Sequence, residues 1–463
     1  MTQEEALIIL KTGANVFLTG EPGAGKTYTV NRYTKYLRGE GIEPAITAST
    51  GIAATHIGGM TIHSWSGIGI KNKLDAYDID KIASNEYISK RINKTKVLII
   101  DEVSMLHADT LSMVDAVCRS VKMNEEAFGG MQVILVGDFF QLPPIQKYSF
   151  DNENQSMFEE EQVAPFAYTS SAWSRLAPVA CYITEQYRQE DGDFLDLLSA
   201  IRRGNVTEEN MKHIEARSVM YEDTPENATK LFSHNADVDR LNTEALSKIS
   251  SEVRNFNTVS TGAPALVAMI KKGCLSPESL ALKVGALVMF TKNNPNKGFV
   301  NGTLGTVIRF EKETWYPVVQ TSNNKIITVE PMDWSIEENG KIKASIAQVP
   351  LRLAWAITVH KSQGMSLDCA VMDLSGVFEY GQGYVALSRV RKLSGLYLLG
   401  INEQVFRVHP DVLEKDIEFR TRSEEAREAF TKISPADIEK MHENFSKASG
   451  EYVGNKKIKK KRR

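Results

Sequence analysis

NVFLTGEPGAGKTYTV, residues 15–30, joins a short apolar run to a glycine-rich turn and then to a predicted helix. The apolar run, residues 16–18, is typical of a buried strand, and the helix is expected to begin at Lys26. The pattern G-x-x-x-x-G-K-[ST] between a strand and a helix is a phosphate-binding loop, because its glycines let backbone N–H groups turn toward a polyphosphate. The alternative, an ordinary glycine-rich turn before a lysine, leaves the flanking strand and helix unexplained. The stretch therefore predicts a nucleoside triphosphate site in an α/β fold.

Individual residues of this loop have expected roles. Lys26 is expected to reach the outer phosphates, and Thr27 to offer its hydroxyl to Mg²⁺. Gln3, at the start of the first predicted helix, carries an amide that can both donate to and accept from the edge of adenine. The residues predicted to contact ATP are Gln3, Gly20, Pro22, Gly23, Ala24, Gly25, Lys26, Thr27, Tyr28 and Gly364.

Length and composition limit the classes of protein to consider. At 463 residues the chain is too long for one hydrophobic core, so at least two substantial domains are expected. No apolar run approaches the roughly 20 residues that a membrane span needs, and the N-terminus lacks the basic start of a signal peptide. The four cysteines are far apart, which favours free thiols in a reducing cytosol over a disulfide or zinc framework. We therefore expect a cytoplasmic protein with no membrane partner.

The net charge of −3 does not by itself indicate a nucleic-acid binder. The exception is the basic end, KKIKKKRR, residues 456–463. Such a block can add non-specific affinity for phosphate backbones, and it also resembles a nuclear-localisation patch. A solvated tail without either role is the third reading, so the block is treated as an accessory.

Two further predicted strands end in polar residues. Asp101 and Glu102 follow the apolar residues 97–100, as in a Walker B motif. Asp101 is expected to hold Mg²⁺ through water, and Glu102 to polarise the attacking water. Gln141 follows the next apolar run and is expected to sense the γ-phosphate. Three consecutive strand-end motifs favour this sensor role over that of an ordinary loop glutamine.

A polar, glycine-punctuated segment, residues 48–65, follows another predicted strand. Ligands bind at the carboxyl edge of α/β sheets, so its hydroxyls together with His56, His63 and Trp65 are candidates to hydrogen-bond phosphates or to stack on bases. A structural crossover loop is the alternative.

The second half of the chain repeats the α/β pattern around a β-rich insert. The second α/β unit is expected to begin near residue 171 and to resume after residue 346. In residues 283–310, two runs of alternating apolar residues flank the turn Asn301-Gly302, which predicts antiparallel strands.

Eight motifs then follow one another in a characteristic order: GEPGAGKT, TASTGIAA with IGGMTIHSW, LIIDEVSML, GDFFQLPP, EQYR, KVGALVMFTKN with NGTLGTV, AITVHKSQGMSLD, and YVALSRV. As a set they resemble the petite-integration-frequency (Pif) helicases, of the RecD-like branch (1B) of helicase superfamily 1. The segment SMLHADTLSMVDAVCRSV is similar to the signature that separates this family from its relatives. The resemblance covers residues 3 to about 400.

The resemblance implies an α/β fold with two RecA-like P-loop domains, a small wedge insert and an SH3-like β insert. The implied divisions are domain 1A at 1–65 and 91–170, the wedge 1B at 66–90, domain 2A at 171–255 and 346–420, the β insert 2B at 256–345, and a C-terminal helical segment with the basic tail at 421–463.

The resemblance also implies the residues that act. Lys26, Asp101, Glu102 and Gln141 keep the roles given above, and Arg188 and Arg389 become the two arginine fingers. An arginine in such a position stabilises the charge of the transition state for phosphoryl transfer. The residues implied to contact DNA are Thr50, Gly51, Thr61, His63, Asn235, Lys292, Thr358, His360, Lys361 and Ser362.

By resemblance, the chain is expected to be an ATP-dependent 5′-to-3′ DNA helicase of replication, repair, recombination, telomere or structured-DNA processing. The expected partners are single-stranded and forked DNA, with G-quadruplexes or RNA–DNA hybrids as further substrates, and the expected solution form is a monomer. Eukaryotic members carry long N-terminal extensions, whereas this chain starts close to its first motif. A bacterial, nucleoid-associated location is therefore expected ahead of a nuclear or mitochondrial one.

Two other function classes compete with the helicase. A P-loop phosphotransferase for a small molecule would leave the second α/β unit and the β insert unexplained. A binding module that holds nucleotide without hydrolysing it is disfavoured by the intact Lys26, Asp101, Glu102 and Arg389. Stimulation of ATP hydrolysis by single-stranded DNA would separate the three.

Overall fold

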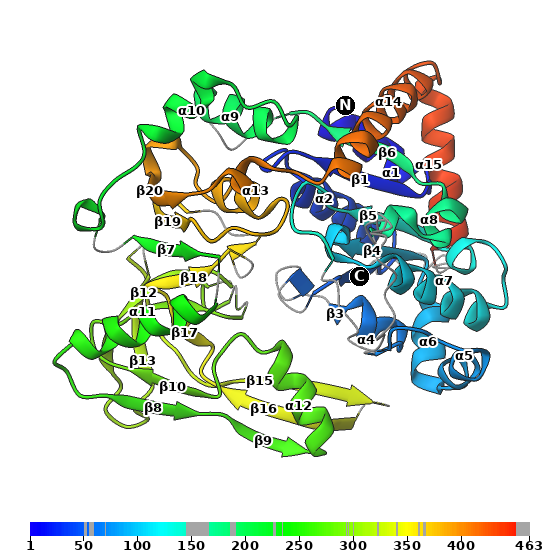
Figure 1. Ribbon diagram of the computed structural model, residues 1–463. Coiled ribbons are helices and arrows are strands. Elements are labelled where there is room, and N and C mark those ends of the chain that lie inside the picture. The colour runs from blue at the N-terminus through cyan, green and yellow to red at the C-terminus, as the bar shows by residue number, and fades with distance from the viewer. Residues whose placement is uncertain are drawn as a thin grey trace, which may run out of the picture.

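The computed structural model describes most of the chain between residues 1 and 450 (Figure 1). The residues outside this description are 51–52, 55–59, 70, 145–165, 186–190, 226–227, 234, 293, 295, 300, 322–323, 339–340, 360–361, 364–366 and 451–463.

A six-stranded parallel sheet organises the first unit, in the order β3-β2-β4-β5-β1-β6. Its strands β1 and β5 are buried along their whole length, which is why they read as continuous apolar runs. The strand bounds are β1 Val16–Gly20, β2 Ala45–Ala48, β3 Met60–Thr61, β4 Val97–Asp101, β5 Gln132–Val136 and β6 Val179–Ile183. The predicted α/β class is confirmed.

Strand β6 lies in this first sheet, whereas the expected division at residue 171 assigns it to the second unit. Its Val179 pairs with Val16 of β1, and the Val179 N–H donates to Asn15 O at 2.8 Å. An apolar run in the chain does not reveal which of two sheets it joins, because strand pairing is a non-local choice. The first sheet therefore extends at least to residue 183.

Helices cover both faces of the first sheet (Figure 1). Helix α1 begins with a capping box, in which the Thr2 hydroxyl accepts from the Glu5 N–H and the Glu5 carboxylate accepts from the Thr2 N–H. The helix bounds are α1 Gln3–Lys11, α2 Lys26–Gly39, α4 Ile62–Ser66, α7 Ala108–Lys122 and α8 Ser171–Leu176.

A pair of short helices, α5 Ala76–Ala83 and α6 Glu86–Lys94, projects from the first unit in the region where the wedge is expected. Each begins at a side-chain cap, Asp75 for α5 and Asn85 for α6. Helix α5 has no buried residue, whereas Ile92 of α6 is buried in the core. The pair is therefore held at its base and exposed at its tip.

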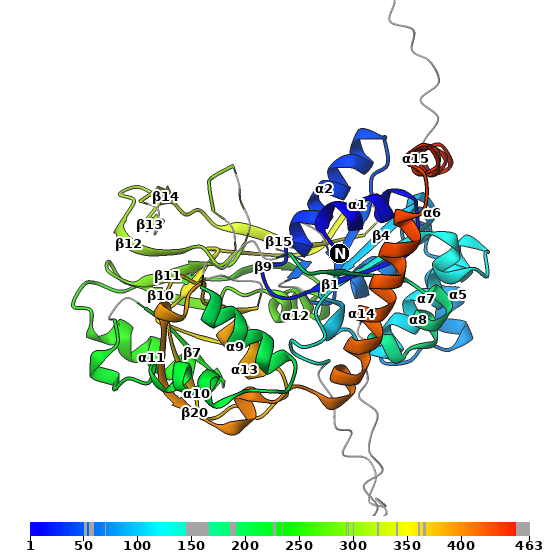
Figure 2. The ribbon, with the colours of Figure 1, turned by 90° about the horizontal axis from the view of Figure 1, so that it is seen from above.

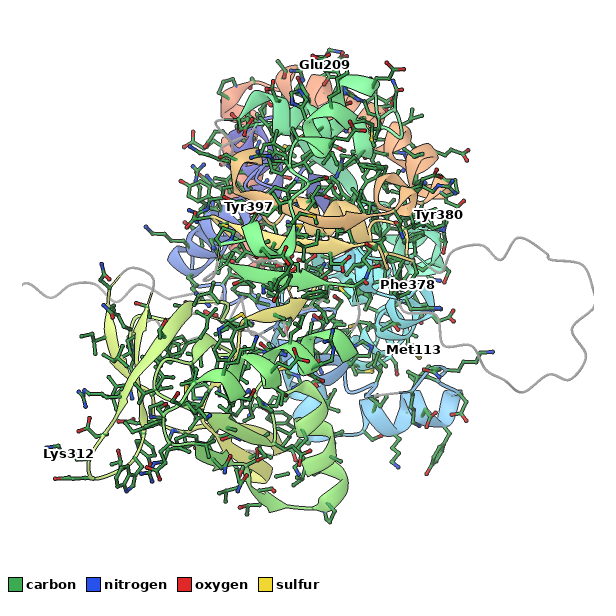
Figure 3. All side chains as sticks on the ribbon, turned by 60° about the vertical axis from the view of Figure 1, so that its left-hand side comes forward. Met113, Glu209, Lys312, Phe378, Tyr380 and Tyr397 are labelled. Atoms are coloured by element: carbon green, nitrogen blue, oxygen red, sulfur yellow. The ribbon has the colours of Figure 1, made fainter. Side chains whose placement is uncertain are left out.

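A four-stranded parallel sheet, in the order β18-β7-β19-β20, organises the second unit. Its elements are β7 Thr229–Phe232, β18 Ala356–Thr358, β19 Ala370–Leu374, β20 Leu396–Ile401, α9 Gly192–Arg202, α10 Glu208–Glu215, α11 Asn235–Lys248 and α13 Gln382–Leu387. In Figure 3, Glu209 of α10 lies at one end of the molecule and Lys312, on the β insert, lies near the other.

The β insert consists of antiparallel sheets, as the alternating pattern predicts. A five-stranded sheet has the order β14-β13-β12-β11-β17, and the segment with Asn301-Gly302 joins β11 to β12. Smaller sheets β15-β16-β9 and β10-β8 and helix α12 complete it. The bounds are β8 Arg254–Asn257, β9 Val259–Gly262, β10 Ser279–Leu282, β11 Leu287–Phe290, β12 Leu304–Phe310, β13 Pro317–Thr321, β14 Ile326–Thr328, β15 Met332–Glu338, β16 Lys341–Gln348, β17 Leu351–Leu353 and α12 Pro264–Gly273.

The last two helices, α14 Pro410–Thr431 and α15 Pro435–Ser449, return to the first unit (Figure 2). The Ser423 hydroxyl of α14 accepts from the Tyr182 N–H of β6 at 2.9 Å. On α15, His442 hydrogen-bonds to Ile8 O of α1 at 3.0 Å. Among the described residues, none of the helices is both long enough and apolar enough to cross a membrane.

Candidate nucleotide site and interdomain cleft

A cavity of about 610 Å³ lies beside the phosphate-binding loop, and residues from both units line it. Apart from Arg32, every one of them is a predicted site residue. The lining residues are Gln3, Pro22, Gly23, Gly25, Lys26, Thr27, Tyr28, Arg32, Glu102, Gln141 and Arg389.

The loop depends on glycine at one point in particular. Gly25 is the N-cap of α2 and adopts φ 86° and ψ 24°, in the left-handed region. A Cβ built on Gly25 would lie 2.1 Å from Nε2 of Gln3. The Gln3 amide is thus packed directly on the loop, and its Nε2 donates to Ala24 O at 3.0 Å.

Lys26 is held by the carbonyl groups of its own loop. Its Nζ donates to Gly20 O at 2.7 Å and to Glu21 O at 3.2 Å. Burial lowers the pKa of Lys26, and the negative charges of Asp138, Glu102 and Asp101 oppose that shift. An incoming phosphate would supply the charge that these neutral carbonyl groups do not.

Asp101 and Glu102 stand at the carboxyl end of β4, as predicted. The Glu102 N–H donates to Asp101 Oδ1 at 2.9 Å, and Glu102 itself has φ 52°, a strained conformation for a residue with a side chain. Burial raises the pKa of Asp101, and burial together with the charge of Asp101 raises the pKa of Glu102 to about 7. Two clustered carboxyl groups with raised pKa values call for a cation or a reacting water beside them.

Gln363 was not predicted as a site residue, yet it connects the two units at this cavity. Its Nε2 lies 3.3 Å from Glu102 Oε2 and 3.3 Å from Gln141 Oε1. Gln363 follows β18 of the second unit, so the contact spans the cleft. The signal that could have found it is its position after a strand end, which is the argument that selected Gln141.

Arg389 enters the cavity from the second unit, just after α13. Its Nε donates to Val385 O at 2.8 Å, and one terminal nitrogen donates to the Ser388 hydroxyl at 2.7 Å. The side chain is 5% exposed and its charge acts on Glu102. Lys26, Glu102, Gln141 and Arg389, taken from four motifs far apart in the chain, thus meet around one cavity.

Several predicted residues fall outside the described part of the chain. They are Gly51, His56, Arg188, His360, Lys361 and Gly364, and for Asn235 the structure describes the backbone of α11 but not the side chain.

The remaining predicted DNA-contacting residues differ in accessibility. Thr61 caps α4, and His63 lies half-buried on the same helix. The Lys292 ammonium donates to Asp333 O and lies 4.7 Å from the centroid of the Trp334 ring.

Three polar or aromatic candidates are buried instead. Thr358 is 3% exposed in β18, and the fully buried Ser362 donates its hydroxyl to Val359 O at 2.7 Å. Trp65, proposed to stack on bases, is 2% exposed in the hydrophobic core, because the short helix α4 turns its ring inward. These side chains do not reach the surface in this arrangement.

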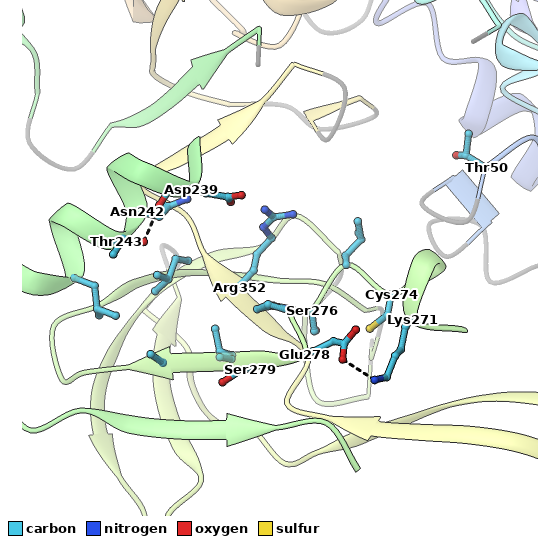
Figure 4. A pocket seen from close by; sticks show the side chains of 16 residues that line it. Thr50, Asp239, Asn242, Thr243, Lys271, Cys274, Ser276, Glu278, Ser279 and Arg352 are labelled. Atoms are coloured by element: carbon cyan, nitrogen blue, oxygen red, sulfur yellow. Dashed lines mark hydrogen bonds and ion pairs between the residues drawn. The ribbon is translucent and has the colours of Figure 1, made fainter. Parts of the chain in front are cut away.

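A second cavity, of about 900 Å³, is lined on one side by Thr50 of the first unit (Figure 4). Its walls come from α11, the end of α12 and the segment 274–281. Arg352 of β17 stands in its middle, only 8% exposed, with a buried Nε that has no hydrogen-bond partner. Burial lowers the Arg352 pKa, which the charge of Asp239 opposes. A buried guanidinium group with an unused donor favours an anionic ligand.

The sequence matches two family models. The model for PIF1-like helicase matches residues 5–212, and the model for the DNA helicase Pif1 2B domain matches residues 266–310. The ATP-dependent DNA helicase Pif1 of Psychrobacter sp. is 40% identical, over 97% of this chain and 75% of the relative. The ATP-dependent DNA helicase PIF1 of Xenopus laevis is 36% identical, and the match spans 89% of this chain and 64% of that protein.

Solved structures resemble the whole architecture. The Pif1 helicase of Candida albicans superposes with a TM-score of 0.76 at 33% identity, covering 90% of this chain and 98% of that one. Pif1 of Bacteroides sp. in complex with ADP-AlF4 gives a TM-score of 0.74 at 30% identity, over 90% and 96% of the two chains. Bacteroides Pif1 has also been solved bound to single-stranded DNA. These matches, together with the nucleotide site at the P-loop, show that the chain belongs to the PIF1-like helicase family.

Proposed function

We propose that this chain is an ATP-driven DNA helicase that translocates 5′ to 3′ on single-stranded DNA and unwinds duplexes ahead of it. The observation that carries the proposal is the cavity in which Gln363 and Arg389 of the second unit meet the P-loop, Glu102 and Gln141 of the first. A site completed by two units is sensitive to their relative position. Hydrolysis at such a site can therefore be coupled to movement between them.

The proposed roles at the nucleotide follow from what each group can donate. Gln3 lies against the loop and reads the adenine edge, and Lys26 neutralises the outer phosphates. Glu102, with its raised pKa, accepts a proton from the attacking water, which Gln141 orients against the γ-phosphate. Arg389 stabilises the charge of the transition state. Arg188 is proposed as the second finger on the resemblance alone.

Mg²⁺ is the proposed cofactor. Asp101 offers a carboxylate and Thr27 a hydroxyl, both hard oxygen ligands of the kind that Mg²⁺ takes alongside waters and substrate phosphates. The raised pKa of the buried Asp101 fits a carboxylate that gains a cation in the working enzyme. When bound, the ion neutralises charge that develops on the β- and γ-phosphate oxygens.

The proposed path of the single strand crosses the cleft from Thr50 to the second cavity (Figure 4). Thr50 offers a hydroxyl, and Arg352 offers a buried, unsatisfied donor to a backbone phosphate. Lys271, paired with Glu278 at 2.5 Å, adds a second cation at the rim of the cavity.

Single-stranded and forked DNA are the proposed substrates, with G-quadruplexes and RNA–DNA hybrids as further ones. Single-stranded and forked DNA are supported by similarity to Pif1 structures, one bound to single-stranded DNA and one with two coordinating Pif1 helicases at forked duplex DNA. G-quadruplexes and RNA–DNA hybrids are proposed on the family resemblance alone. We propose a monomer in solution, and a bacterial cytoplasm, in association with the nucleoid, as the location.

The first test is ATP hydrolysis with and without oligo-dT, for the parent chain, Lys26→Ala and Arg389→Ala. The parent is expected to be strongly stimulated by the oligonucleotide, and each variant to lose roughly a thousandfold of that activity. Hydrolysis that is indifferent to DNA would exclude the motor. Full activity in Arg389→Ala alone would leave the motor in place and remove Arg389 from the catalytic set. Unwinding of forks with either a 5′ or a 3′ loading tail then tests the polarity.

A further inference from the structure

Arg202, the last residue of α9, is a charged side chain in the interior of the protein. It is 2% exposed and ranks first among the largest fully buried side chains. Its guanidinium group donates to Asp138 Oδ1 at 2.6 Å, to the Tyr182 hydroxyl at 2.7 and 3.1 Å, and to the Tyr384 hydroxyl at 3.2 Å. It also lies 3.6 Å from Asp416 Oδ1 of α14, so this one side chain contacts acceptors from four other segments.

Two of these partners, Asp138 and Tyr384, belong to the two segments that carry catalytic side chains. Asp138 and Phe140 lie in the loop that leads from β5 to Gln141, and the guanidinium group stacks on the Phe140 ring at 4.1 Å from its centroid. Tyr384 lies on α13, which leads to Arg389. Arg202 therefore connects the Gln141 loop of the first unit with the Arg389 helix of the second.

The backbones of these two segments are also in direct contact. Gly381, the N-cap of α13, lies so close to the loop that an added Cβ would be 2.5 Å from Phe140 O and 2.7 Å from Gln141 O. A shift of the loop must therefore move the start of α13, or the contact must open.

Charge makes this junction costly to break. Asp138 is fully buried, and its second oxygen, Oδ2, has no hydrogen-bond partner. Arg202 is its direct ion-pair partner, and the charge of Lys26 also acts on it. A buried ion pair adds little net stability, but removal of one partner leaves an uncompensated charge. The pair consequently favours one relative placement of loop and helix over others.

We propose that Arg202 is a positioning residue that couples the Gln141 loop to the Arg389 helix, so that both catalytic side chains take their places together. This inference rests on the proposed ATP-driven motor and adds the element that synchronises its two halves. In the described part of the chain, no hydrogen bond joins Arg202 to Gln3, Lys26 or Thr27, although burial together with the charge of Arg202 lowers the pKa of Lys26. A lysine at position 202 keeps that charge, so ATP should still bind when the coupling is lost. The defect is expected in turnover.

The test compares Arg202→Lys and Tyr384→Phe with Arg420→Lys. Lysine keeps the charge beside Asp138 but cannot make the forked contacts to both tyrosine hydroxyls, and Tyr384→Phe removes one hydroxyl while the ion pair stays. Arg420 is the comparison residue, because it contacts the same Tyr182 hydroxyl at 2.5 Å and pairs with Asp416, which also lies 3.6 Å from Arg202. Arg420→Lys therefore changes these two shared partners but leaves the contacts of Arg202 to Asp138 and Tyr384 in place.

With saturating oligo-dT, Arg202→Lys is expected to lower kcat about 10-fold to 100-fold, since a misplacement of about 1 Å can cost that much. KM for ATP should stay within about twofold of the parent, and Tyr384→Phe should show a smaller loss of the same kind. Arg420→Lys should leave both constants unchanged. Thermal unfolding of each variant shows that the assays are made on folded protein.

The outcomes separate this inference from the proposed function. A parent chain without DNA-stimulated hydrolysis would overturn the motor itself. A stimulated parent, with Arg202→Lys and Tyr384→Phe both turning over at the parental rate, would overturn the coupling alone. A kcat loss in Arg420→Lys equal to that in Arg202→Lys would reduce Arg202 to a general structural residue, and a raised KM at unchanged kcat would assign it to ATP binding.

Discussion

The contacts of the Gln363 amide depend on how the second unit is placed relative to the first. Its Nε2 reaches carboxylate and amide oxygens that belong to the opposite side of the cleft, each at 3.3 Å. Both distances are long for N–H···O hydrogen bonds, which typically lie between about 2.7 and 3.2 Å. A small closure would shorten both contacts together, and a small opening would lose both.

Removal of this amide should therefore impair turnover. Gln363→Leu, of similar size, is expected to lower DNA-stimulated kcat about tenfold or more, while the affinity for a fluorescent ATP analogue stays near the parental value. The exposed Gln320→Leu on β13 serves as the control for a glutamine change in the second half of the chain. Parental turnover in Gln363→Leu would show that the contact has no role in hydrolysis.

Gly25 offers a test of the loop itself. In Gly25→Ala the new Cβ would both strain the left-handed backbone, at about 1–2 kcal/mol, and displace the Gln3 amide. The loop should relax out of its binding shape, so ATP affinity is expected to fall about tenfold, measured by titration with a fluorescent analogue.

Gly39→Ala provides the matched comparison. Gly39 ends the same helix α2, and nothing lies within 4 Å of a Cβ added there. ATP affinity should not change in this variant. Equal losses at the two glycines would attribute the effect to the helix rather than to the loop.

At the scale of secondary-structure elements, the alternating pattern of the β insert predicts its strands and their antiparallel pairing. Asn301-Gly302 is not the tight turn between them, because residues 291–303 separate β11 from β12 and the Gly302 N–H donates to Phe290 O at the end of β11. Strand β6 was assigned to the wrong sheet, because its partner β1 is more than 150 residues away in the chain. The role of Arg202 has no local sequence signal, because its partner Asp138 lies 64 residues away in the chain.

The same reasoning limits the candidate site. The meeting of the P-loop, Glu102 and Gln141 at one cavity was predictable, because each follows an apolar strand that ends at the same edge of a parallel sheet, and their catalytic roles stay predictions. The burial of Thr358 and Ser362 was not, because it depends on how the segment after β18 packs against its surroundings. Motif spacing identifies the residues, and tertiary packing decides which of them reach a ligand.

Strand β17 supplies a test of the proposed DNA path. Arg352→Gln is expected to weaken binding of oligo-dT and to reduce the slope of log K against log salt by about one, as expected for the loss of one phosphate contact. Arg309→Gln, on β12 of the same insert and already paired with Glu311, should leave the slope unchanged. An unchanged slope in Arg352→Gln would show that the single-stranded DNA does not contact Arg352. Fluorescence anisotropy at several salt concentrations gives both slopes.

At the scale of the whole molecule, α14 binds the first unit through an aromatic cluster. The Phe419 ring packs against Phe17, Phe139, Tyr168 and Trp173, with ring centroids 4.8 to 6.0 Å apart. The helix thus fills the core that lies under the first sheet, although it comes after the entire second unit in the chain.

Phe419→Ala should therefore destabilise the protein by about 3–5 kcal/mol. Ile417→Ala, on the same helix and 67% exposed, should change stability by less than about 0.5 kcal/mol. Urea unfolding of the two variants gives the comparison. A small effect at Phe419 would mean that α14 is only loosely attached.

The return of α14 and α15 to the first unit also determines where dyes and attachment points should be placed to follow movement between the units. Helices α1 and α15 are in contact, so both ends of the described chain lie on the first unit. Energy transfer between two dyes placed at these ends should stay constant when the two units move relative to each other. The distance between one dye on α5 and another near Lys312 of the β insert should change whenever the two units move relative to each other. A bead or a fused protein attached at either end would therefore be attached to the first unit, which contains the P-loop. It would not restrain the second unit.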